Sequence, residues 1–154
     1  MYLISVVVLL ILAPVVSIVA EFVTGAVPPD LIGVIGKWMT FWAVGVRLFM
    51  AGVRQTAQPS FTAKDIFQID DPRAGGLVRE IGFGNLAMGL LGLASFLKPE
   101  WLVPAAIVGG LYYGLAGLGH VVKGERNAKE NIAMLTDFLA FIVLAVFVVM
   151  RGLY

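Results

Sequence analysis

The feature that most constrains this chain is a set of five long apolar runs separated by short polar or proline-containing stretches. Crossing roughly 30 Å of hydrocarbon takes about 20 apolar residues in a helix. Outside a closed β-barrel, a chain segment in lipid can pair all its backbone N–H and C=O groups only as a helix. The sequence therefore predicts an all-α, polytopic membrane protein with one domain over residues 1–154. The expected spans lie at about 2–22, 31–53, 78–97, 102–122 and 132–150.

The composition agrees with this class. Hydrophobic residues make up 60% of the 154 residues and charged residues 14%, against about 45–50% and about 25% in soluble domains. A net charge of +1 is uninformative about nucleic-acid binding, but the sequence has no basic patch interleaved with exposed aromatics, so no nucleic-acid partner is expected. The absence of cysteine excludes disulfides and thiolate metal sites. One histidine with scattered carboxylates does not make a transition-metal site, so no metal is expected.

The first run, MYLISVVVLLILAPVVSIVA, has the apolar character of a signal peptide. It lacks a basic start, and its apolar stretch exceeds the roughly 7–15 residues of a signal-peptide core. We therefore expect this run to be a permanent membrane span.

The longest connection between spans, residues 54–77, contains a segment of mixed character. Residues 61–69, FTAKDIFQI, interleave phenylalanines and isoleucines with a lysine and an aspartate. Such a pattern is typical of a short amphipathic segment at a membrane interface. An ordinary polar loop with scattered apolar residues explains it equally well.

Five crossings place the N-terminus, the loop 54–77 and the turn 123–131 on the same side of the membrane. That side carries seven lysines and arginines, and the other side carries three. By the positive-inside rule, we expect a multi-pass protein of the cell inner membrane with its N-terminus in the cytoplasm and its C-terminus outside.

The same topology gathers five polar residues in one leaflet: Arg47, Glu80, Asn85, His120 and Asp137. Ionisable groups near the membrane centre cost at least ~2.5–3.5 kcal/mol each, so they normally face the bundle and find partners. Arg47 can balance Glu80 and Asp137, and His120 can carry either charge state. The cluster is either an internal network that holds the helices together or a binding or proton-handling site open to the interface.

Simpler roles are available to some of these residues. Asn85 can cross-link two helices, and His120 can cap the C-terminal end of its helix. Asp137 is harder to explain structurally, because it is the deepest acid and the rest of its helix, FLAFIVLAVFVV, is apolar.

Glycines in the third and fourth spans predict close helix packing. A small residue every three or four positions lets another backbone approach closely. We expect these two spans to pack on each other as a tight hairpin, with a seam between identical chains as the alternative. The glycines of this pattern are Gly89, Gly92, Gly110, Gly114 and Gly117.

Two stretches, REIGFGNLAMGLLG and GLGHVVKGERNAKENIAMLTDFLAFIVL, resemble a family of small prokaryotic membrane proteins catalogued as a domain of unknown function. The family pattern has an acid-x-Gly-x-x-Asn motif, a Gly-His that closes the next helix, and an Asn-rich turn before an aspartate. The resemblance covers a little over half the chain and includes neither the first span nor Arg47. The matching positions are Glu80, Gly82, Asn85, Gly119, His120, Asn127, Asn131 and Asp137.

The chain is also similar, more distantly, to the DoxX-like four-helix membrane bundles, some of which accompany quinone-linked oxidoreductases. That resemblance implies a bundle of four helices with the first span added to it. Likeness of fold is a weak warrant for function. The family of unknown function supplies a candidate site and no reaction.

From these residues we expect a non-enzymatic protein, either an accessory subunit of a larger membrane complex or a small homo-oligomer. Its polar cluster would hold the bundle together and could also bind a lipid or quinone headgroup, so membrane lipids are the expected partners. The alternative is a membrane-embedded enzyme that uses Glu80 or Asp137 as general acid or base, with His120, on a lipidic substrate. A third candidate, a proton-coupled transporter, lacks the inverted repeat and interrupted helices of that class.

Overall fold

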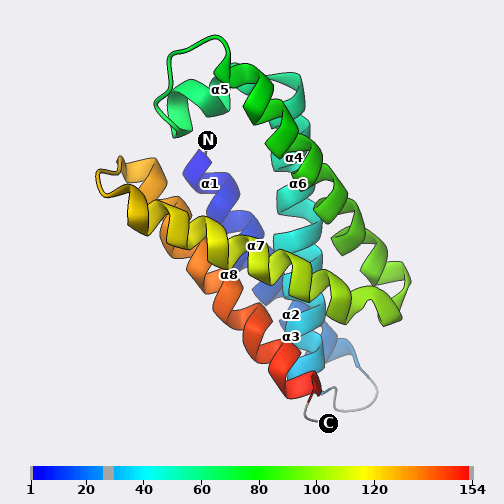
Figure 1. Ribbon diagram of the computed structural model, residues 1–154. Coiled ribbons are helices and arrows are strands. Elements are labelled where there is room, and N and C mark those ends of the chain that lie inside the picture. Colours follow the sequence, from blue (N-terminus) through cyan, green and yellow to red (C-terminus); the bar gives the residue numbers. More distant parts are fainter. Residues whose placement is uncertain (1, 26–29, 153–154) are drawn as a thin grey trace.

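The computed structural model describes residues 2–25 and 30–152, and these residues form helices and connections with no strand among them (Figure 1). Five helices within these ranges are long and apolar enough to cross a membrane, as the sequence predicts. They are Ile4–Thr24, Leu31–Ala57, Ala74–Leu97, Pro99–Lys123 and Ala128–Arg151.

Several of these spans contain more than one helical element. The first comprises α1 (Tyr2–Val7), the π-helical η1 (Val8–Leu12) and α2 (Ala13–Thr24). The second comprises α3 (Leu31–Met39), the π-helical η2 (Thr40–Arg47) and α4 (Leu48–Ala57). The remaining elements are α5 (Pro59–Phe61), η3 (Thr62–Ile66), α6 (Ala74–Leu97), η4 (Pro99–Trp101), α7 (Leu102–Lys123) and α8 (Ala128–Gly152).

Helix ends follow local side-chain chemistry. Asp30 caps α3 by accepting hydrogen bonds from the backbone N–H groups of Ile32 and Gly33. At the start of α8, Asn127 and Glu130 form a reciprocal capping box: each side chain accepts a hydrogen bond from the other's backbone N–H. These caps begin α8 at Ala128, four residues before the predicted start of the span.

The glycine-rich helices α6 and α7 contact each other, but their closest glycine packing is against other helices, which corrects the expected tight hairpin. Gly92 lies so close to Gly45 that an added Cβ would come within 2.5 Å of the Gly45 backbone nitrogen. The glycines of α6 therefore let its backbone approach η2 and α4. On α7, Gly117 instead accommodates the ring of Phe138, and α7 packs chiefly against α8.

The first span is held to the second by polar contacts. Glu21 of α2 accepts hydrogen bonds at 2.6 Å from Lys37 Nζ and from the Trp38 indole N–H. The Trp42 indole N–H donates to Ser17 Oγ at 3.0 Å. These contacts fix the α2 half of the first span against α3 and η2.

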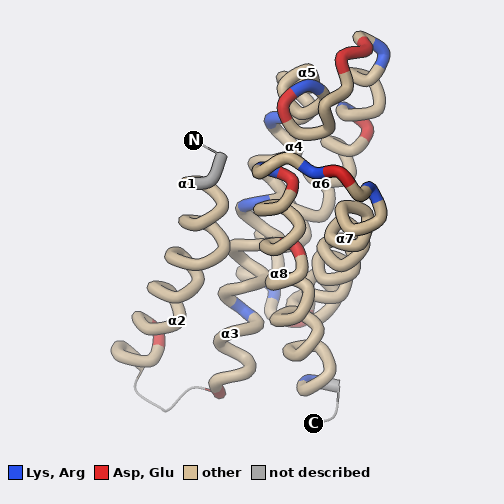
Figure 2. Tube along the Cα trace, turned by 90° about the vertical axis from the view of Figure 1, so that its left-hand side faces the viewer, with Lys and Arg blue, Asp and Glu red and all other residues tan. Residues whose placement is uncertain are grey.

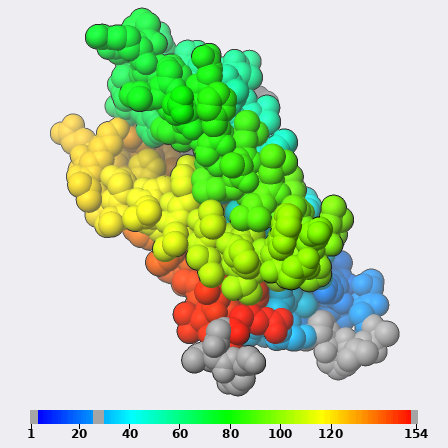
Figure 3. All heavy atoms as spheres, turned by 45° about the vertical axis from the view of Figure 1, so that its right-hand side comes forward, coloured from blue at the N-terminus to red at the C-terminus, as the bar shows by residue number. Residues whose placement is uncertain are grey.

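One end of the molecule carries α1, the α5–η3 segment and the turn between α7 and α8 (Figure 1). Most charged residues gather near this end, and the middle of the bundle is largely uncharged (Figure 2). Figure 3 shows the segment after α5 and the α7–α8 turn as neighbouring protrusions there. This arrangement agrees with the predicted grouping of connections, and the orientation relative to the cytoplasm stays a prediction.

The 61–69 segment is helical over its first part and divides into two faces. Phe61, Ile66 and Phe67 are partly buried, whereas Lys64 and Asp65 are exposed. Lys64 Nζ pairs with Asp70 Oδ1 at 2.7 Å, and this hydrogen bond raises the pKa of Lys64. The segment is therefore amphipathic, with its apolar face turned toward the bundle.

A candidate binding cavity between the helices

A cavity of about 430 Å³ lies beneath the α5–η3 segment. Its walls come from all five spans, because α1, η2, α4, α6, α7 and α8 each contribute lining residues. Much of the wall is apolar and includes Val6, Leu9, Leu48, Phe61 and Phe67. Its polar lining includes Arg47, Arg54, Gln55, Asn85, His120 and Asp137.

A buried ion pair forms part of the cavity wall. Arg47 Nη2 donates to Asp137 Oδ1 at 3.1 Å, and the two side chains are 16% and 9% exposed. The Arg47 guanidinium also lies 5.0 Å from the centre of the Tyr113 ring. The Tyr113 hydroxyl in turn donates to the Ala43 carbonyl at 2.5 Å. The pair thus joins the last residue of η2 to α8, and π-helical segments such as η2 are frequent at functional sites.

Asn85 contributes a second polar contact to the wall. Its Nδ2 donates to Gln55 Oε1 at 2.7 Å, and the residue is only 2% exposed. The hydrogen bond joins α6 to α4, so Asn85 does cross-link two helices. Both side chains also line the cavity, so the cross-link is part of its polar wall.

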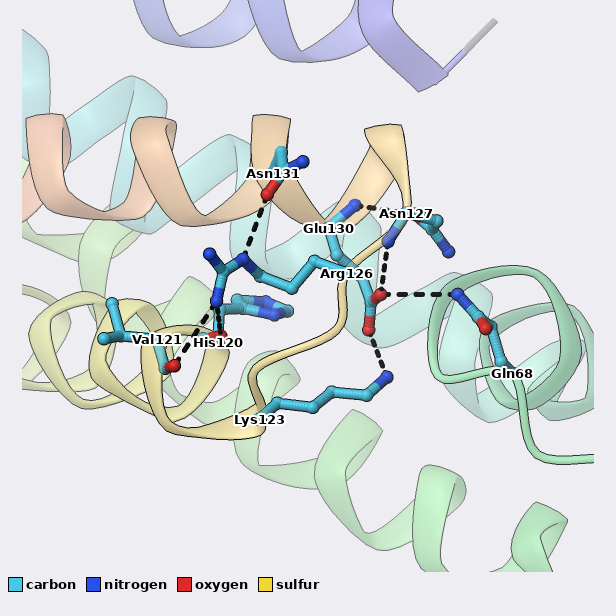
Figure 4. Close-up of polar contacts among 8 residues, drawn as sticks. All are labelled: Gln68, His120, Val121, Lys123, Arg126, Asn127, Glu130 and Asn131. Atoms are coloured by element: carbon cyan, nitrogen blue, oxygen red, sulfur yellow. Dashed lines mark hydrogen bonds and ion pairs between the residues drawn. The ribbon is translucent and has the colours of Figure 1, made fainter.

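His120 lines the cavity from the C-terminal part of α7. The capping role considered for it belongs to a different residue: Arg126 Nη1 donates to the carbonyls of His120 and Val121 at 2.8 and 3.3 Å (Figure 4). The His120 imidazole therefore contributes to the cavity wall rather than to the helix end.

Arg54 lies seven residues after Arg47, which places the two arginines on the same face of the second span, about 10 Å apart along its axis. Its guanidinium carbon is 3.6 Å from the centre of the Phe61 ring. Arg54 is not among the site residues predicted from the sequence, although its spacing of seven from Arg47 was an available signal. Gln55, Tyr112 and Tyr113 also line the cavity without having been predicted.

Three predicted site residues lie outside the cavity lining. Glu80 is exposed on α6. Asn127 caps α8, and Asn131 Oδ1 accepts a hydrogen bond from Arg126 Nε at 3.0 Å. The structure therefore brings together Arg47, Asn85, His120 and Asp137, and places the two asparagines at the α7–α8 turn.

Glu130 forms a polar centre at that turn which the sequence analysis missed (Figure 4). Its side chain is 0% exposed, and Lys123 Nζ pairs with its Oε1 at 2.5 Å. Its Oε2 accepts hydrogen bonds from the Asn127 backbone N–H at 3.0 Å and from Gln68 Nε2 at 3.4 Å. The contact from Gln68 ties the segment after η3 to α8. The Asn-x-x-Glu spacing of a capping box was the available signal.

The metal-ligating residue types do not converge in the described part of the chain: no three His, Cys, Asp or Glu side chains there form a group able to hold a metal ion. Arginine, amide and phenol groups dominate the polar wall of the cavity instead. Such groups recognise oxygen-bearing molecules by hydrogen bonding.

Together, the five helices and the cavity define a polytopic helical membrane protein with an internal, partly polar cavity. The chain belongs to a family of unknown function, DUF6790, whose sequence pattern matches residues 2–153. The match extends over the first span and Arg47, which the resemblance seen in the sequence did not cover. No curated protein and no solved structure matches the chain. The likeness to DoxX-like bundles stays a prediction.

Proposed function

We propose that this protein binds the polar head of a lipid-like amphiphile in the cavity and acts as an accessory subunit or small homo-oligomer. The observation that carries the proposal is the Arg47–Asp137 pair in the wall of a cavity of about 430 Å³. A purely structural ion pair needs no neighbouring space of this size.

The size and lining of the cavity support a ligand. Ligand pockets commonly have volumes of about 300–1,000 Å³, with apolar walls and a small number of placed polar groups. This cavity has that volume, aliphatic and aromatic walls, and polar side chains from all five spans. The combination suits a molecule with both a polar head and an apolar part.

The route into the cavity supports a ligand that comes from the membrane. Ser5, Val6 and Leu9 line it from the first span, and Met50 lines it from α4. Met50 is also 54% exposed, so the cavity wall reaches the surface of the bundle. A molecule dissolved in lipid can approach there without crossing water. We place this end of the molecule at the cytoplasmic face of the inner membrane, because most basic residues lie there.

Native mass spectrometry of the purified protein in detergent tests this proposal. We expect the wild type to retain a bound amphiphile. Ala116→Phe, which adds a ring to the cavity wall, should lose it. Leu115→Phe is the matched control, because Leu115 precedes Ala116 in the chain and its side chain is exposed on the outside of α7. Equal retention by both variants would contradict the proposal.

Catalysis on a lipidic substrate is a second candidate, because His120 and Asp137 line the same cavity. An imidazole and a carboxylate near a bound molecule can transfer protons to or from it. The bound molecule recovered from wild type and from His120→Gln separates the two functions. The same molecule in both supports binding alone, and an unconverted precursor in the variant supports catalysis.

A further inference from the structure

We infer that the head bound in this cavity is anionic, with a phosphate or carboxylate group held by Arg54. The inference rests on the proposed function and names the chemical class of its ligand. It follows from the balance of charge around the cavity and from the way Arg54 is held.

The ionisable side chains that line the cavity carry an excess of positive charge. Besides two neutral tyrosines, they are Arg47, Arg54, His120 and Asp137. Arg47 and Asp137 compensate each other at 3.1 Å. Arg54 makes no ion pair with any residue in the described ranges. An anion at Arg54 would therefore supply the charge that the wall lacks.

Four acids near this end have cationic partners other than Arg54. Asp65 pairs with Lys129 at 3.6 Å, and Asp71 pairs with Arg73 at 2.9 Å. Asp70 and Glu130 pair with lysines in the same way. None of these four carboxylates is therefore committed to Arg54, which leaves its guanidinium for a ligand.

Phe61 holds Arg54 in a form suited to binding an anion. The guanidinium carbon lies 3.6 Å from the ring centre, a distance at which the cation rests against the aromatic face. Guanidinium N–H groups point outward in the plane of the group, where they match the two oxygens of a carboxylate or phosphate. The ring can thus cover one face of the guanidinium while its edge stays available.

This arrangement distinguishes an anionic amphiphile from a quinone. Arg54 is an exposed residue at the cavity wall, and a neutral quinone head would offer its guanidinium no anionic partner. An anionic head compensates that charge. The neutral polar part of the same head can lie toward the Arg47–Asp137 pair, about 10 Å along the helix.

Lipid titrations followed by native mass spectrometry test the inference. Delipidated protein is titrated with phosphatidylglycerol, with phosphatidylcholine of the same acyl chains, and with ubiquinone. We expect phosphatidylglycerol to bind about tenfold more tightly than ubiquinone, which offers no anion, since a charge-assisted hydrogen bond is typically worth at least that factor. Phosphatidylcholine carries the same phosphate, but its choline cation cancels the net charge, so it should also bind more weakly than phosphatidylglycerol. Arg54→Gln should remove this preference, and Arg54→Lys should restore part of it.

The control is Arg79→Gln. Arg79 is an exposed arginine of α6 near the same end, and it does not line the cavity. It should bind phosphatidylglycerol as the wild type does. Equal losses in Arg54→Gln and Arg79→Gln would show a general surface attraction and overturn the inference. Equal binding of all three lipids by the wild type would also overturn it.

Two further arms separate the inference from the proposed function and identify the source of the anion. If Ala116→Phe abolishes lipid binding while Arg54→Gln keeps the wild-type preference, the cavity binds an amphiphile but its anionic class is wrong. If Ala116→Phe leaves phosphatidylglycerol binding intact, both fail. Inorganic phosphate that displaces phosphatidylglycerol from wild type, but not from Arg54→Gln, supports the anion site and assigns it to a free phosphate.

Discussion

Glu130 and Asp137 are buried carboxylates two helical turns apart on one face of α8, yet their surroundings differ. Glu130 receives two side-chain donors, from Lys123 and Gln68, and the Asn127 backbone N–H, and it does not line the cavity. Asp137 pairs with Arg47 and faces the cavity. A carboxylate surrounded by donors has its hydrogen bonds satisfied within the protein, whereas a carboxylate beside a cavity has space next to it for a ligand. Within a single helix, one acid is enclosed by donors and the other lines a cavity.

The largest expected effect comes from Glu130→Ala. The change removes half of a capping box and an ion pair, so we expect a loss of about 2–4 kcal/mol in the free energy of unfolding. Thermal unfolding in detergent measures the loss. Hydrogen exchange should also rise over residues 62–70, because the Gln68 contact disappears. A variant as stable as the wild type would show that the two acids do not differ in this way.

Asp137→Asn should cost less, about 1–3 kcal/mol, because the amide still accepts a hydrogen bond from Arg47 while the charge is lost. The variant should remain folded in detergent. Removing the acid that lines the cavity should raise the affinity of the protein for phosphatidylglycerol several-fold. A weaker affinity in a folded variant would contradict the charge balance inferred for the cavity.

Gln68→Ala tests how much the segment after η3 contributes to the surroundings of Glu130. Gln68 has a φ of 59°, a left-handed conformation that favours glycine. The alanine variant keeps this strain and loses the hydrogen bond to Glu130, so we expect a loss of about 1 kcal/mol. Gln68→Gly loses the same bond but relieves the strain, and its stability should stay close to that of the wild type. Equal losses of unfolding free energy in the two variants would show that the backbone of Gln68 is not strained.

The smallest expected change in stability comes from the double variant Arg47→Met with Asp137→Leu. Replacing a buried ion pair by apolar side chains of similar volume is often neutral, so we expect unfolding within about 1 kcal/mol of the wild type. Retention of the bound amphiphile should nevertheless fall. A double variant that fails to fold would assign the pair a structural role comparable to that of Glu130.

The sequence predicted the five spans because the length of an apolar run is a local property. The sequence also predicted that Arg47, Asn85, His120 and Asp137 lie in the same leaflet of the membrane. The leaflet of each residue follows from the number of crossings before it. The rotation of each helix was not available from such an argument. Glu80 and Asn85 are five residues apart, about 140° around the helix, and only Asn85 lines the cavity.

Partner choice was the other part that could not be predicted. The glycines of α6 and α7 indicate that another helix comes close, and they carry no information on which helix it is. Glu130 was hidden for a related reason. In the sequence it is one charged residue in a polar turn, and it becomes buried only because Gln68 and Lys123 meet it in the folded chain.

The pairing of α6 with η2 and α4, and of α7 with α8, has a mechanical consequence. The α6 backbone touches η2 and α4 through glycine, and phenylalanine rings of α8 fill glycine positions of α7, so each pair, one half of the molecule, has little room for sliding. The Arg47–Asp137 contact lies across the seam between these halves, beside the cavity. Any rocking of one half against the other changes the length of this contact and the width of the cavity together. The Arg47–Asp137 distance therefore reports the separation of the two halves.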